Sequence, residues 1–212
     1  MQNTTKDARF WDRIARKYAA DKIEDQAGYE RTLERTRHYL KATDRVLEFG
    51  CGTGSTALKL APHSGSYLAT DVSGEMVTIA REKLAENPVA GLEFAATTLD
   101  DLNAAPDSFD SVLGFNILHL VPSLSDAVRR ARSFLKPGGL FITKTACLKD
   151  MNPLIQLAIP VMQAFGQAPN VVIFSARQLE TVIMSAGFEI VEVARHASKG
   201  KDTRPFIVAR KV

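Results

Sequence analysis

The sequence predicts a three-layer α/β sandwich, with helices on both faces of a mostly parallel sheet that ends in an antiparallel hairpin. Three observations predict it. From Asp44 onward, short apolar runs alternate with amphipathic segments, these runs are apolar throughout, and a polar loop joins the last two. Continuously apolar runs are typical of parallel strands buried on both faces, whereas a close final pair indicates a hairpin.

The first 41 residues predict helices. Two sets of side chains fall on one helical face each: Phe10, Trp11, Ile14 and Tyr18, and then Tyr29, Leu33, Thr36 and Leu40. Five apolar runs then predict the parallel strands, at residues 45–49, 66–70, 92–95, 111–115 and 140–145, and the runs 188–193 and 205–209 predict the hairpin.

Capping residues mark the helices between these strands. Ser73 is a predicted N-cap, and residues 175–178 read as a capping box that opens a helix closed by Gly187. Ser125 is expected just before another helix, which ends at Pro137-Gly138-Gly139 because proline stops a helix and glycine permits the turn that follows.

Length and composition exclude several classes of protein. The 212 residues are 45% hydrophobic and 24% charged and show no repeat or linker, which predicts one globular domain over residues 1–212. The longest apolar stretch, residues 154–165, is too short to span a bilayer, and the N-terminus lacks the apolar core of a signal peptide. Cys51 and Cys147 provide neither a disulfide framework nor a metal-ligand cluster. We expect a cytoplasmic protein without a metal.

The formal net charge of +3 is too small to indicate a nucleic-acid partner. The charge is uneven, however, because residues 195–212 contain six basic side chains and a single acid, Asp202. Such a run is typical of a solvated surface, here the terminal hairpin. The alternative is a surface that attracts anions.

The most informative segment is a predicted strand that runs directly into three glycines. Residues 46–54 read Val-Leu-Glu-Phe-Gly-Cys-Gly-Thr-Gly, and a helix is predicted from Ser55 onward. Glycine is needed where a backbone turns tightly and a ligand approaches it closely. Asp71 stands at the end of the next strand, where a carboxylate can accept hydrogen bonds from ribose hydroxyls. Together they predict an adenosine-containing ligand.

Two features indicate which adenosine derivative this is. Ser55 occupies the position where a dinucleotide fingerprint has glycine or alanine, and Glu48 lies two residues before the first glycine. A carboxylate repels a pyrophosphate but attracts an ammonium or a sulfonium. The segment therefore favours a cationic adenosine derivative over a dinucleotide.

These residues resemble the class I S-adenosylmethionine-dependent methyltransferases, in particular the small-molecule branch similar to the ubiquinone/menaquinone C-methyltransferases. Residues 109–116 match the fourth strand of that family, 135–140 match the turn before its fifth strand, and 10–18 match its N-terminal helix. The resemblance covers residues 8–145 well. It implies a Rossmann-like seven-stranded sheet, an N-terminal helical cap over residues 1–41, and S-adenosyl-L-methionine as cofactor.

The resemblance also implies roles for single residues. The glycine turn lies against the methionine part of the cofactor, Glu48 near its ammonium and Tyr18 near its carboxylate, while Asp71 holds the ribose. Where the family has an aspartate at the adenine, this chain has Thr98 and Leu99, with Asp100 and Asp101 as nearby acids that could take the role. The implied cofactor contacts are Tyr18, Glu48, Gly50, Cys51, Gly52, Gly54, Asp71, Val72, Met76, Thr98, Leu99 and Asn116.

Two features concern the methyl acceptor. His119, three residues after Asn116, is a candidate general base, unless it only packs at the start of the next helix. Residues 151–174 form an apolar insertion, which includes Phe165 and in which Pro160 would kink a helix. This insertion is either a lid on the acceptor pocket or a plain packing helix. A lid would indicate a small hydrophobic acceptor.

The predicted activity is in-line transfer of a methyl group to that acceptor, which requires alignment in a dry pocket but no covalent intermediate. A protein or RNA methyltransferase is the runner-up among enzymes. Against it, the fourth strand ends in Phe115-Asn116-Ile117-Leu118 rather than Asn/Asp-Pro-Pro-Tyr, and the chain has no appended RNA-binding domain or broad basic face. A non-catalytic S-adenosylmethionine-binding regulator and a nicotinamide oxidoreductase are two further functions that these residues leave open.

Overall fold

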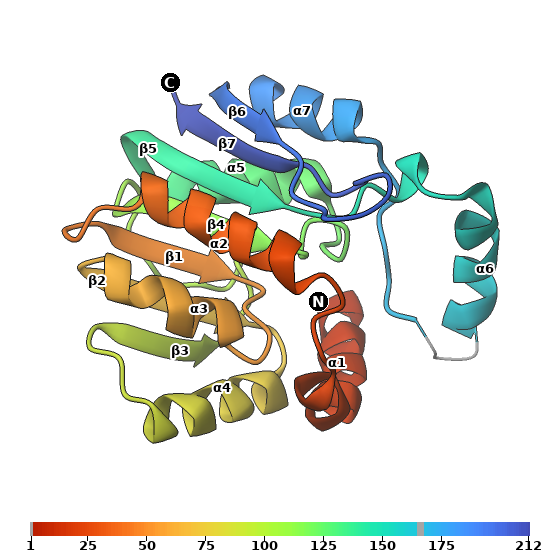
Figure 1. The fold of residues 1–212 in the computed structure, drawn as a ribbon, viewed down its shortest axis with the longest axis horizontal. Helices are drawn as coiled ribbons and strands as arrows, with labels where there is room; N and C mark the ends of the chain where they lie inside the picture. The colour runs from red at the N-terminus through yellow and green to blue at the C-terminus, as the bar shows by residue number, and fades with distance from the viewer. Residues whose placement is uncertain (1, 165–167) are drawn as a thin grey trace.

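A computed structural model describes residues 2–164 and 168–212. Within them lies a seven-stranded sheet in the order β3-β2-β1-β4-β5-β7-β6 (Figure 1). β1 to β5 are parallel, and β7 runs antiparallel between β5 and β6. The predicted fold class is thereby confirmed. The strands are β1 (Arg45–Phe49), β2 (Ser66–Asp71), β3 (Leu92–Ala96), β4 (Phe109–Phe115), β5 (Leu135–Lys144), β6 (Phe188–Ala194) and β7 (Phe206–Lys211).

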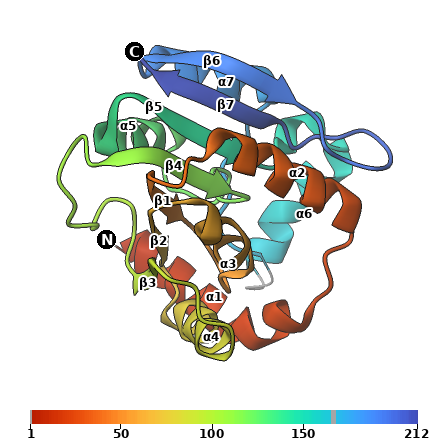
Figure 2. The same cartoon turned by 60° about the vertical axis from the view of Figure 1, so that its left-hand side comes forward.

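Helices cover both faces of the sheet (Figures 1 and 2). They are α1 (Gln2–Ala20), α2 (Gln26–Tyr39), α3 (Ser55–Leu60), α4 (Gly74–Glu86), α5 (Leu124–Phe134), α6 (Pro153–Ala164) and α7 (Ala176–Ser185), with short 3-10 turns at Ala61–His63 and Leu148–Asp150. Neighbouring residues of a strand point to opposite faces. Val46 therefore packs into a core with α2, α3 and α4, while Leu47 packs into a second core with α5 and α7.

Local signals explain most helix boundaries. The Ser73 side chain accepts a hydrogen bond from the Met76 amide, and Ser175 forms the predicted capping box with Gln178. The start of α5 was predicted two residues too late, because its N-cap is Ser123 rather than Ser125. α5 also ends earlier than Pro137, at Phe134. Residues 137–139 lie inside β5, where they make a bulge opposite Phe109–Ser111 instead of ending the helix.

α1 is attached to α4 at the carboxyl edge of the sheet. Asp12 accepts hydrogen bonds from the Ser73 hydroxyl at 2.6 Å and from the Glu75 amide at 3.1 Å, and buried Ala15 packs in a cluster with Met76 and Ile79. The Arg16 ion pairs to α4 are exposed and add little, so the Asp12 hydrogen bonds and the packing of Ala15 hold the helix. The last turn of α1 is thereby fixed beside the ends of β1 and β2.

α6 stands away from the sheet (Figure 1). The side chains of Leu154 and Leu157 are 69% and 72% exposed, and Val161 and Met162 are exposed as well. Phe165, which belongs to the predicted apolar insertion, lies outside the described residues. In the described ranges, none of the helices combines the length and the apolar character needed to cross a membrane.

Candidate functional site

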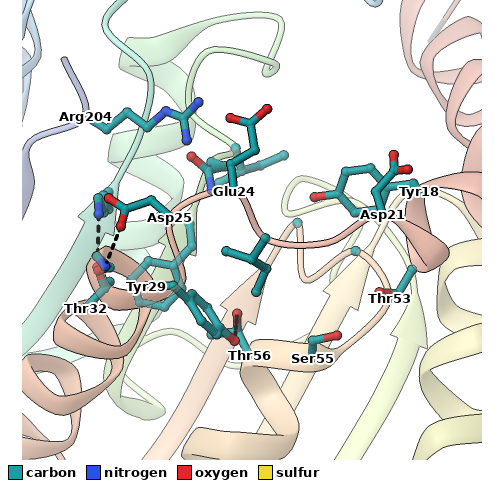
Figure 3. A pocket seen from close by; sticks show the side chains of 18 of the residues that line it. Tyr18, Asp21, Glu24, Asp25, Tyr29, Thr32, Thr53, Ser55, Thr56 and Arg204 are labelled. Carbon is teal, nitrogen blue, oxygen red and sulfur yellow. Dashed lines mark hydrogen bonds between the residues drawn. The ribbon is translucent and has the colours of Figure 1, made fainter. Parts of the chain in front are cut away.

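A cavity of about 850 Å³ opens at the carboxyl edge of the parallel strands. This is the edge at which open α/β sheets bind ligands. Its wall comes from the turn after β1, the ends of β2, β4 and β5, helices α1 and α2 with their linker 21–25, and the loop 197–204 (Figure 3). Eight of the predicted cofactor contacts line it: Tyr18, Glu48, Gly50, Cys51, Gly52, Asp71, Met76 and Asn116.

Gly52 forms the part of the glycine turn that faces the open cavity. Its φ angle is +54°, in the left-handed region that favours glycine. A Cβ atom added at Gly54 would lie 2.7 Å from atoms of Ala80 and Phe94, so that glycine is required for packing. At Gly52 the nearest atom would be the Tyr18 ring, 3.9 Å away. A Cβ at Gly52 would therefore occupy space that is open to a ligand.

Asp71 connects the ends of β1 and β2. Its Oδ2 accepts a hydrogen bond from the Gly52 amide at 2.8 Å, and its Oδ1 accepts one from the Ser73 amide at 2.9 Å. Burial raises the pKa of Asp71, and the hydrogen bonds from these two backbone amides oppose that rise. The carboxylate thus fixes the glycine turn and forms part of the cavity wall.

Glu48 is a second buried carboxyl group at the same edge, with 1% of its surface exposed. Its Oε2 accepts a hydrogen bond from the Tyr67 hydroxyl at 2.7 Å. Burial raises the pKa of Glu48 to about 7, with a smaller contribution from the negative charge of Asp71, although the Tyr67 bond lowers it. A positively charged group in the cavity would relieve the repulsion between these two carboxylates.

The last turns of α1 cover this acidic part of the cavity. Trp11 and Tyr18 pack edge to face with ring centroids 6.0 Å apart, and both line the cavity. In Figure 3, Tyr18 and Asp21 lie at one end of the cavity, whereas Arg204, Asp25 and Thr32 lie at the other. The aromatic pattern in residues 10–18 was the sequence signal for this cover.

The remaining predicted cofactor contacts, Gly54, Val72, Thr98 and Leu99, are not part of the cavity wall. The Thr98 hydroxyl donates a hydrogen bond to the Asp101 carboxylate at 2.7 Å and accepts one from the Asp101 amide. The Leu99 side chain is buried in the core, and its carbonyl accepts a hydrogen bond from Arg130. Their roles at the adenine stay predictions.

His119, the candidate general base, lies in the turn between β4 and α5 and is also not part of the wall. Its Nδ1 lies 2.9 Å from the Thr145 hydroxyl, within hydrogen-bond distance. Burial and, to a lesser degree, the positive charge of Arg204 lower the pKa of His119 to about 4. The side chain is therefore neutral at pH 7 and a weak base. This geometry agrees with a packing role, and a catalytic role stays a prediction.

The half of the cavity beyond Asn116 was not identified from the sequence. It contains the apolar side chains of Phe115, Ile117 and Leu120, and the ammonium of Lys144. Lys144 ends β5, and its Nζ donates a hydrogen bond to the Thr32 hydroxyl at 3.0 Å. Its position at the end of a predicted parallel strand was the one signal that could have found it.

Comparison with known proteins finds similarities for the central part of the chain. Residues 46–139 match the family model of a methyltransferase domain. The chain is 37% identical over 100 residues to the ubiquinone/menaquinone biosynthesis C-methyltransferase UbiE of Geotalea daltonii, a match covering 45% of this chain and 42% of that protein. It is 26% identical over 176 residues to the non-reducing polyketide synthase atr1 of Stereocaulon alpinum, covering 80% of this chain. The chain spans 7% of the length of that synthase.

A solved structure resembles the chain over its whole length. The magnesium protoporphyrin IX methyltransferase of Synechocystis PCC 6803, solved with bound S-adenosylhomocysteine, superposes with a TM-score of 0.74 at 17% identity. The match covers 99% of this chain and 100% of that one. Residues 46–139 thus match a methyltransferase domain, and the chain shares its fold with that solved methyltransferase.

Proposed function

We propose that the protein is an enzyme that transfers a methyl group from S-adenosyl-L-methionine to a small acceptor with a hydrophobic part. One observation carries the proposal: Gly52 faces an open cavity between Tyr18 and the two buried carboxyl groups of Glu48 and Asp71. The methyltransferase domain over residues 46–139 supports it.

The residues at the acidic end fit this cofactor by their chemistry. Gly52 leaves room for the methionine part, and Tyr18 closes over it. Glu48 would attract the ammonium, and Asp71 would accept hydrogen bonds from the ribose. Met76 lines the same part of the wall and would contact the adenine. When bound, S-adenosylmethionine supplies a methyl group on a positively charged sulfur.

The chain contributes to the reaction through position and exclusion of water. An in-line displacement needs the acceptor atom, the methyl carbon and the sulfur in one line, and a neutral leaving group needs no acid. Phe115, Ile117 and Leu120 provide an apolar wall beyond Asn116 against which an acceptor would be held. No covalent bond to the protein is required.

In this proposal residues 1–212 act as one domain, with residues 1–41 as its cap and 151–174 as an insertion on the acceptor side. Of the described residues in that insertion, Met151 is the one that lines the cavity. The side chains of Leu154, Leu157, Val161 and Met162 on α6 are exposed, which supports a helix that closes over a hydrophobic acceptor.

Titration calorimetry with S-adenosylhomocysteine and with NAD tests the proposal. We expect the first to bind and the second not to bind. Asp71→Asn removes one acceptor oxygen and a charge, so the affinity for S-adenosylhomocysteine should fall by about 1.5–3 kcal/mol, roughly 10- to 150-fold. Asp126→Asn, on the exposed surface of α5, is the matched control. Binding of NAD alone would overturn the proposal.

A further inference from the structure

The charge of the side chains at the carboxyl edge of the sheet changes from negative to positive along the order of the strands. Following the strand order, β2 ends at Asp71, β1 holds Glu48 near its end, β4 is followed by neutral Asn116, β5 ends at Lys144, and Arg204 lies two residues before β7. All five line the same cavity. The cavity therefore has an acidic end at β2 and β1 and a basic end at β5 and β7, separated by the end of β4.

We propose that the acceptor carries an anionic group, a carboxylate or a phosphate, which Lys144 and Arg204 bind at the basic end. This inference rests on the proposed function, which assigns the acidic end to the cationic cofactor. It specifies the hydrophobic acceptor of that proposal further: the acceptor is amphipathic, and its apolar part lies against Phe115 and Ile117.

Lys144 is positioned for a ligand. Its ammonium has three N–H donors, and one of them binds the Thr32 hydroxyl. That hydroxyl in turn donates to the Gly28 carbonyl at 2.8 Å and lies 3.0 Å from His196 Nδ1. The network fixes the side chain, and burial lowers the pKa of Lys144. An anion would replace the hydration that the ammonium has lost.

Arg204 reaches the same end from the loop 197–204 (Figure 3). In the described part of the chain its guanidinium has no hydrogen bond or ion pair. Its positive charge lowers the pKa of Lys144, and it also lowers the pKa values of Tyr18 and His119. A free guanidinium at a cavity wall is suited to paired hydrogen bonds with carboxylate or phosphate oxygens.

The carboxylates nearest to the basic end accept hydrogen bonds from backbone amides. Asp202 accepts hydrogen bonds from the amides of His196, Ala197 and Arg204, and Asp25 accepts them from Gly28 and Ser198. The bond from Ser198 to Asp25 holds the loop 197–204 against the start of α2, while the Asp202 bonds fix the loop internally. Glu24 and Asp21 also line the cavity, from the linker between α1 and α2; in Figure 3 Asp21 lies beside Tyr18, whereas Glu24 lies nearer to Arg204. The basic groups are thus the ones with donors directed at the cavity.

The spacing of the strands sets the size of such an acceptor. Neighbouring strands lie about 4.8 Å apart, so the ends of β1 and β5, two strands apart, are separated by about 10 Å. In an acceptor that reacts near β4, one ring or a short chain between the reacting atom and the anionic group would be long enough to reach Lys144.

The experiment measures binding to the protein saturated with S-adenosylhomocysteine, by calorimetry. The probes are hydroxyaryl carboxylates, medium-chain fatty acids and aryl phosphates, each paired with its neutral carboxamide or alcohol. We expect at least one anion to bind ten-fold or more tightly than its neutral partner. Lys144→Met and Arg204→Met should each remove most of that preference, and Lys144→Arg should retain it. Lys149→Met, which changes a cation outside the cavity wall, is the matched control.

Each outcome has one meaning. If wild-type protein fails to bind S-adenosylhomocysteine, the proposed function fails. If it binds but no anion is preferred, or if the preference survives in both methionine variants, this inference fails and the proposed function stands. If Arg204→Met and Lys144→Met instead weaken S-adenosylhomocysteine binding ten-fold, the basic end binds the carboxylate of the cofactor, and the inference is again overturned.

Discussion

Replacing Glu48 with glutamine should make the ligand-free protein more stable while it weakens cofactor binding. In the folded chain burial raises the pKa of Glu48 from 4.5 to about 7. Between these values the folded state binds a proton that the unfolded state has released, so the free energy of unfolding falls as pH rises. The full difference corresponds to about 3 kcal/mol, at 1.4 kcal/mol for each pKa unit. It is absent below pH 4.5 and complete above pH 7.

Glutamine keeps an oxygen that can accept the Tyr67 hydrogen bond but has no charge to bury. Urea unfolding at pH 5 and pH 8 should therefore show that Glu48→Gln gains about 2–3 kcal/mol over wild type on going from the lower pH to the higher. Glu93→Gln, an exposed position on β3, should show no such gain. Equal pH dependence in wild type and Glu48→Gln would refute the reasoning.

The same ionisation should control binding of S-adenosylhomocysteine, whose ammonium needs the charged form of Glu48. With a pKa of about 7 in the free protein, and a lower one in the complex, wild-type affinity should fall about ten-fold from pH 8 to pH 6. Glu48→Gln should bind more weakly at pH 8 by about 1.5–3 kcal/mol, and its affinity should not change between these pH values. Calorimetry at both pH values measures this.

Three further substitutions test other parts of the site. Gly52→Ala fills open space in the cavity and strains a positive φ, so we expect at least ten-fold weaker S-adenosylhomocysteine binding with a stability loss of only about 1 kcal/mol; unchanged affinity would move the cofactor away from Gly52. His119→Gln should keep kcat within ten-fold of wild type once an acceptor is found, because a true general base contributes about 10²–10⁴-fold. Leu157→Asp should leave stability within about 0.5 kcal/mol, since the side chain is exposed, and should reduce acceptor turnover far more than cofactor affinity. Equal loss of both would remove the lid proposal.

The order of helices and strands could be predicted because its signals are local. Apolar runs, a capping serine at Ser73 and the capping box at Ser175 each act within a few residues, and the structure places them as expected. The boundary between α5 and β5 could not be predicted in the same way. Residues 137–139 read as a turn between two elements, but pairing with β4 makes them a bulge within a strand. The structure of residues 137–139 was thus determined by pairing with a distant strand and not by the local sequence.

The two ends of the cavity also differ in whether their residues lie close together in the sequence. Glu48, Gly52 and Asp71 lie within 24 residues and belong to one strand-turn-helix-strand unit, so a reading of local sequence could bring them together. Thr32, Lys144 and Arg204 lie more than 50 residues from one another in the sequence, and only the sheet order and the packing of α2 bring them to one end. The sequence shows the run of basic side chains in residues 195–212, but such a run alone does not distinguish a solvated surface from the wall of a cavity.

This separation has a consequence for how acceptor choice can change. The loop 197–204 is held to the start of α2 by the hydrogen bonds from Ser198 to Asp25 and is fixed internally by Asp202, and it shares no hydrogen bond with the glycine turn in the described residues. Substitutions in this loop can therefore alter the charge of the basic end without moving Gly52 or Asp71. Because sites that share no partners contribute nearly additively, a double variant of Glu48→Gln and Arg204→Met should show the sum of the two single effects on S-adenosylhomocysteine affinity, within about 0.5 kcal/mol. A larger deviation would mean that the two ends of the cavity bind one and the same ligand group.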